Sequence, residues 1–175
     1  PTRSPTPVAI GSGGPPSCHH RRMDLPVRVL GHTPPPPLPG VRQWWGNDEA
    51  DNGLYLRHGM GLTPAAVMSE LFTPAFVEVR GCVLLRHRFS ERNFLTWWDK
   101  LDGDVIRIES VLNHTHLWDL MPEPTDGADE DILDWIGERL AEAWLDRVSR
   151  LFPQRRFYCE LVDDYGPTIS LHQAG

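Results

Sequence analysis

The sequence predicts an α+β protein: a four-stranded antiparallel sheet made of two hairpins, with about three helices packed on one face, preceded by a disordered Pro/Gly-rich arm. Three observations carry this prediction. Eleven of the 17 prolines lie within residues 1–40. Two stretches alternate in polarity around a glycine-containing turn, and one long stretch has apolar residues at helical spacing.

The proline distribution predicts three segments along the chain. Residues 1–40 are rich in proline and glycine and contain little that can be buried, so they cannot offset the entropy lost on ordering and should be disordered. Residues 41–70 form a transitional linker with several glycines. Residues 71–175 are expected to form the single α+β domain.

The first half of that domain predicts a hairpin followed by two helices. A strand from Phe76 and a strand from Cys82 to Phe89 flank the turn Arg80-Gly81, where glycine supplies the positive φ that such turns need. Ser90 is a candidate N-cap for a helix that reaches Leu101. Asp104 is a candidate N-cap for a second helix through Leu112.

The second half predicts a long helix and a second hairpin. An apolar stripe at helical spacing extends for nearly six turns: Ile132, Ile136, Leu140, Trp144, Val148 and Leu151. Acidic residues precede the stripe and arginines end it, as the helix macrodipole favours, and Pro153 stops it. Residues 157–171 then alternate around the turn Asp163–Gly166.

Charge and motif content restrict the function. The net charge is −7, which excludes a generally basic nucleic-acid binder. No run of 18 apolar residues is present, and no phosphate loop, nucleophile elbow or cofactor motif is found, so we expect no cofactor. Three cysteines form a sparse, odd set typical of reduced thiols in a cytoplasmic protein. Cys82 and Cys159, on predicted strands, are expected to be buried and inert.

The leading functional prediction is a small, acidic, tryptophan-rich protein that acts by binding another protein, with no enzymatic activity. The chain has seven tryptophans and an acidic loop before the long helix, and both features favour association with a basic partner. The predicted interaction surface is formed by that loop and the start of the helix: Glu123, Asp126, Asp129, Glu130, Asp131 and Trp135.

A metal-assisted hydrolase is a second hypothesis. His114 and His116 could reach one ion if they lie on a strand, where residues two apart share a face, and Glu109 could add a third ligand. On a helix the two imidazoles would diverge, and they would serve instead to hydrogen-bond the last carbonyls of the helix.

A single-stranded nucleic-acid binder is a third hypothesis. If the two hairpins adjoin, Arg86 and Arg88 would share an outer sheet face with Arg156 and Tyr158, a combination that can stack bases. The acidic excess of residues 71–175 opposes this, because it repels a polyanion.

Overall fold

The computed structural model describes residues 35–41 and 52–175. The chain divides into two units, Pro1–Thr33 and Pro34–Gly175, and every described residue belongs to the second unit. The arm that the sequence predicts to be disordered, residues 1–40, therefore lies almost entirely outside the described residues.

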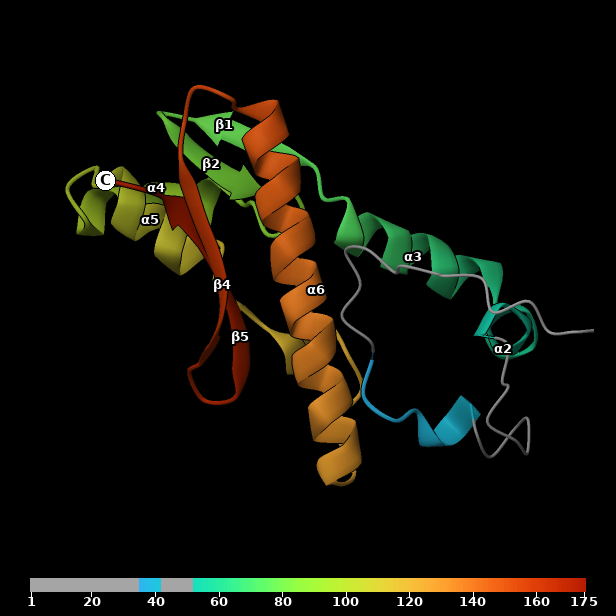
Figure 1. Cartoon of the computed structure of the whole chain (residues 1–175). Helices are drawn as coiled ribbons and strands as arrows, with labels where there is room; N and C mark the ends of the chain where they lie inside the picture. The colour runs from blue at the N-terminus through green and yellow to red at the C-terminus, as the bar shows by residue number, and fades with distance from the viewer. Residues whose placement is uncertain (1–34, 42–51) are drawn as a thin grey trace, which may run out of the picture. The chain divides into compact units, whose positions relative to one another are not determined.

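The described part of the second unit alternates helices with short strands (Figure 1). The elements follow in this order: α2 (Asn52–Gly59), α3 (Leu62–Phe72), β1 (Phe76–Val79), β2 (Cys82–Leu85), α4 (Glu91–Lys100), α5 (Val105–Leu112), β3 (Thr115–His116), the 3₁₀ helix η1 (Leu117–Asp119), α6 (Gly127–Leu151), β4 (Phe157–Asp163) and β5 (Pro167–Gln173). Two helices, α2 and α3, thus occupy the stretch that the sequence analysis treats as a linker. Asp104 caps α5 as expected, because its side chain accepts a hydrogen bond from the Arg107 amide.

The strands form two separate sheets, so the predicted single four-stranded sheet is wrong. β1 and β2 pair as an isolated antiparallel hairpin, in which Phe76 lies opposite Leu85. The second sheet has the order β3-β5-β4, and all its pairs are antiparallel. Both predicted hairpins therefore form, but β2 and β5 do not pair with each other through their backbones.

Two side chains from the end of α5, Glu109 in its last turn and Asn113 at its C-cap, bridge β2 and β5. Glu109 accepts hydrogen bonds from the Val83 amide (2.6 Å) and from the Gln173 amide (2.6 Å) and side chain (2.7 Å). Asn113, one helical turn further on, accepts from the Leu85 amide (2.8 Å) and donates to the carbonyls of Val83 (2.9 Å) and Leu171 (3.1 Å). We call Glu109 and Asn113 the polar seam. The seam satisfies backbone groups that strand pairing would otherwise satisfy, and it links β2 to β5 through side chains.

Helices pack on both faces of the β1–β2 hairpin, so the prediction of helices on one face is also wrong. All four residues of β2 are buried. Val83 and Leu85 join the hydrophobic cluster formed with α6 and β5. Cys82 and Leu84, which point the opposite way, join a second cluster formed with α4 and α5.

The long helix α6 connects the larger cluster to the second sheet. Its buried face is Leu133, Gly137, Leu140, Ala141, Trp144 and Val148. A Cβ atom on Gly137 would lie 2.5 Å from Cδ1 of Leu117 and 2.8 Å from Cδ1 of Leu161, so glycine allows η1 and β4 to approach the helix closely. Among the described residues, no helix is both long and apolar enough to cross a membrane.

Candidate functional site

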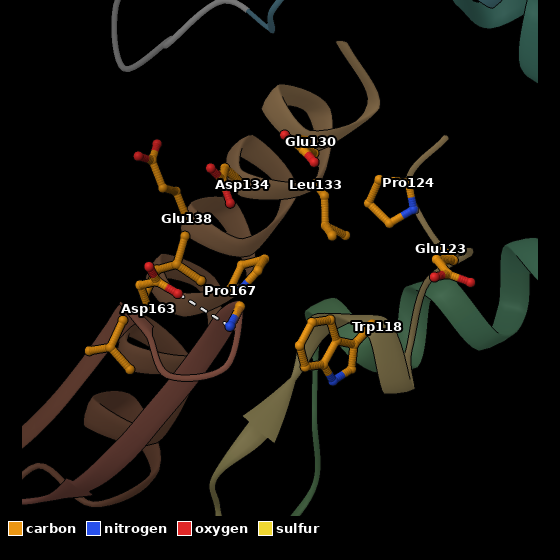
Figure 2. A pocket seen from close by; sticks show the side chains of 12 residues that line it. Trp118, Glu123, Pro124, Glu130, Leu133, Asp134, Glu138, Asp163 and Pro167 are labelled. Atoms are coloured by element: carbon orange, nitrogen blue, oxygen red, sulfur yellow. Dashed lines mark hydrogen bonds between the residues drawn. The ribbon is translucent and has the colours of Figure 1, made fainter. Parts of the chain in front are cut away.

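A groove with a volume of about 690 Å³ is bounded by the first half of α6, the β4–β5 turn and the chain from η1 to Pro124 (Figure 2). Its apolar lining is formed by Trp118, Pro124, Leu133, Leu161, Val162 and Pro167. Its charged lining is formed by Glu123, Glu130, Asp134, Glu138 and Asp163. The groove therefore combines an apolar surface with five carboxyl groups, and it has the size of a ligand or peptide site.

Three of these carboxyl groups come from one face of α6. Glu130, Asp134 and Glu138 are four residues apart, so they project in a row from successive helical turns (Figure 2). Glu123 comes from the loop on the other side of the groove, and Asp163 comes from the last residue of β4. Asp163 also accepts a hydrogen bond from the Gly166 amide (3.2 Å), which closes the turn between the strands.

The pKa of Asp134 reflects the presence of several other carboxylates close to it. Partial burial raises the pKa of Asp134 above its ordinary value, and the negative charges of Asp131, Glu138, Asp163 and Glu130 raise it further. The ionised form of Asp134 is therefore disfavoured, and a cation placed in the groove would favour it.

The groove carboxylates have little internal charge compensation within the described part of the chain. Glu138 lies 3.5 Å from the Arg139 guanidinium, in a contact between sequence neighbours at the protein surface. None of the other four groove carboxylates forms an ion pair with a described residue. This negative potential is thus available to a positively charged partner.

Trp118 supplies an aromatic surface next to these carboxylates. It belongs to η1, and its side chain is 47% exposed although the preceding residue, Leu117, is completely buried. The indole lies directly against the β4–β5 turn: a Cβ atom on Gly166, which has a φ of +100°, would lie 2.6 Å from the ring. The His116 ring also lies beside the indole, with ring centroids 5.5 Å apart. The indole is therefore in contact with both the β4–β5 turn and β3.

The six residues of the predicted interaction surface lie in different environments in the structure. Glu123 and Glu130 line the groove, but Asp126 and Asp129 are engaged in capping α6. Asp126 accepts hydrogen bonds from the amides of Ala128 and Asp129, at 3.0 Å each. Asp129 accepts from the amide and hydroxyl of Thr125, and these bonds lower the pKa of Asp129 below its ordinary value.

The other two predicted surface residues lie outside the groove lining. Asp131 is exposed and contributes to the negative potential at Asp134. Trp135 is half-buried, and the Arg139 guanidinium lies over its ring at 5.9 Å from the centroid. Trp135 therefore already has a cation–π contact with Arg139, which lies one turn further along the same helix.

Of the charged and aromatic residues that line the groove, the sequence analysis did not select four as site residues: Trp118, Asp134, Glu138 and Asp163. The spacing of Glu130, Asp134 and Glu138 was a usable signal, because residues four apart on a helix share a face. Nothing local in the sequence marks the approach of Trp118 to the β4–β5 turn, since the two are far apart along the chain.

The three residues of the metal hypothesis are not brought together. His114 and His116 are adjacent, with ring centroids 4.7 Å apart, around the short strand β3. His116 contacts the Thr168 hydroxyl (2.7 Å), and His114 lies 3.6 Å from the Asp164 carboxylate. Glu109 is completely buried in the polar seam. Among the described residues, no group of three histidine, cysteine or acidic side chains is arranged to hold a metal ion.

The residues of the nucleic-acid hypothesis do not share a sheet face. β2 ends at Leu85, and the chain then turns, because the Arg88 amide bonds back to the Leu85 carbonyl (3.1 Å). Arg86 and Arg88 therefore lie in a turn. Arg156 precedes β4, and Tyr158 is exposed on β4, where its ring lies beside that of His172. The separation of β2 from β5 prevents the continuous platform that the sequence analysis considered.

Burial controls the chemistry of the two described cysteines. Cys82 and Cys159 are free thiols; Cys82 is buried as expected, whereas Cys159 is half-buried. Burial raises the pKa of Cys82 to about 11, and the nearby Glu109 adds to the shift. Burial also raises the pKa of Cys159 to about 12, with a smaller contribution from Glu160. Both thiols are protonated near neutral pH, which disfavours a nucleophilic role.

We expect native Cys82 and Cys159 to resist alkylation. With a pKa of about 11, roughly one Cys82 thiol in a thousand is ionised at about pH 8. Iodoacetamide labelling of a Cys18→Ser variant, followed by intact-mass measurement, should show slow labelling of the native protein and two rapid additions after unfolding in urea. Native labelling as fast as that of a cysteine peptide would contradict this prediction.

The described fold and the groove define a mixed helix–strand protein with an acidic, aromatic-lined groove on its surface. No family model, no curated protein sequence and no solved structure matches the chain. The functional argument therefore depends on the geometry and charge of the groove.

Proposed function

We propose that this protein is a non-enzymatic binding protein whose acidic groove receives a basic segment of a partner protein. The observation that carries the proposal is the set of five carboxyl groups around the groove, four of which form no ion pair with a described residue. The free thiols of Cys82 and Cys159 support a reducing, cytoplasmic setting for this interaction.

Charge and shape have different roles in this proposal. A concave surface lined by charges of one sign concentrates the field and raises the association rate of an oppositely charged partner. The apolar lining, including Leu133 and Leu161, offers surface that a bound segment can remove from water. Affinity would thus come from the apolar contacts, and charge would select the partner and accelerate its capture.

The test is to neutralise the two groove carboxylates that lie furthest along the row on α6. The double variant Asp134→Asn/Glu138→Gln should bind a short fluorescent peptide of alternating arginine and serine roughly tenfold more slowly at low ionic strength, and the difference should shrink as salt is added. Stopped-flow fluorescence measures the association rate. The matched control is Glu91→Gln/Asp99→Asn, which removes the same charge from α4, outside the groove.

The melting temperature provides a second readout, because neutralising Asp134 should stabilise the fold although it weakens the capture of the peptide. Because the pKa of Asp134 is raised in the folded state, the ionised carboxyl group opposes folding at neutral pH, and this unfavourable contribution disappears as the pH falls through the folded pKa. Asp134→Asn should therefore raise the melting temperature at neutral pH while it slows peptide binding. Equal association rates for the groove variant and the α4 control at low salt would remove the proposed function.

A further inference from the structure

Trp118 differs from the other partly exposed tryptophans of the described chain. Trp97, Trp98 and Trp135 each have a cation over the ring, supplied by Lys100, Arg80 and Arg139 at 4.9, 5.0 and 5.9 Å from the ring centroid. Trp118 has no such cation from a described residue, although it lines the acidic groove. An aromatic face attracts a cation, and nearby carboxylates strengthen that attraction.

Trp118 also faces the carboxylates of α6 across the groove. Gly166 and His116 lie against the indole, as described above. Figure 2 shows Trp118 on one side of the groove and the row of Glu130, Asp134 and Glu138 on the other. A side chain that enters between them meets a flat aromatic surface and several carboxylate oxygens.

An arginine side chain can interact favourably with the aromatic face and with the carboxylates at the same time, whereas a lysine side chain gains less from the aromatic face. The guanidinium group is planar and weakly hydrated, so it can stack on an indole while its N–H groups donate to carboxylates in a forked geometry. The lysine ammonium is a compact, strongly hydrated charge that gains mainly from the general negative potential.

We infer that the groove selects arginine over lysine, with the guanidinium group stacked on Trp118 and hydrogen-bonded to the carboxylates of α6. This inference rests on the proposed function, because it names which basic side chain the groove takes. In this arrangement Trp118 determines specificity, and the carboxylates determine the overall attraction to basic segments.

The test compares two peptides of equal length and charge, one alternating arginine with serine and the other alternating lysine with serine. Fluorescence anisotropy with the full chain should give a dissociation constant roughly two- to fivefold lower for the arginine peptide. Trp118→Leu should remove this preference and leave the affinity for the lysine peptide nearly unchanged. Trp118→Phe, which keeps an aromatic face, should retain part of the preference, and circular dichroism should confirm that both variants are folded.

The outcomes separate the inference from the proposed function. Equal affinity for the two peptides in the unmodified protein would overturn arginine selection and leave the basic-segment proposal standing. A preference that survives in a folded Trp118→Leu variant would overturn the role of Trp118. If neither peptide binds, the proposed function fails together with the inference.

Discussion

Replacing Asn113 with alanine is expected to lower the free energy of unfolding by about 3 kcal/mol or more, because three buried hydrogen bonds are lost. The Leu85 amide and the carbonyls of Val83 and Leu171 would each lose their partner in the polar seam. Leaving such groups buried and unpaired costs more than a typical hydrogen bond contributes. Urea unfolding followed by far-ultraviolet circular dichroism measures the change.

Two further variants sharpen this experiment. Asn113→Asp keeps the shape and the acceptor but loses both N–H donors, so it should also be strongly destabilising. Asn93→Ala makes the same substitution at an exposed position of α4 and should change stability by about 0.5 kcal/mol or less. If Asn113→Ala and Asn93→Ala unfold at the same urea concentration, the polar seam does not hold the hairpins together.

The second large effect is expected at Trp144. Its side chain is the largest that is completely buried, and it lies in the cluster that joins α6 to both sheets. Trp144→Ala should lower the free energy of unfolding by about 3–5 kcal/mol, as large-to-small core substitutions do. Trp97→Ala, on the half-buried face of α4, is the control and should cost clearly less.

Trp144 also has a polar function that a second variant isolates. Its indole Nε1–H donates to the Leu71 carbonyl (2.6 Å) near the end of α3. Trp144→Phe keeps most of the apolar contact and removes this bond, so it should release the end of α3 before the rest of the molecule unfolds. Limited proteolysis should then cut the Phe variant between α3 and β1 faster than the unmodified protein. Equal cleavage rates would show that the bond does not anchor α3.

The hairpins and helices of the domain were predictable from the sequence, but their assembly was not. Arg80-Gly81 correctly marked a tight turn, and Asp104 correctly marked the start of α5. Glu109, in contrast, was interpreted as a possible metal ligand, and Asn113 was not considered. Their bonds reach residues 26 to 64 positions away, so no local pattern reveals them.

The candidate site was only partly predictable from the sequence. The charge of the loop before α6 correctly directed attention to Glu123 and Glu130, but it could not distinguish carboxylates that cap a helix from those that face a groove. The buried stripe of α6 is displaced at its first turns, where Leu133 and Gly137 are buried instead of Ile132 and Ile136, and the predicted stripe residue Leu151 is 47% exposed. The displacement occurs because Gly137 lets Leu117 and Leu161 pack against the helix.

The polar seam has a consequence for the two strand edges that it covers. A strand edge with free N–H and C=O groups can recruit a strand from another molecule. Glu109 and Asn113 occupy such groups on β2 and on β5 at the same time. A fluctuation that detached α5 would expose both edges in a single event, so the docking of one eight-residue helix covers two strand edges that could otherwise pair with another molecule.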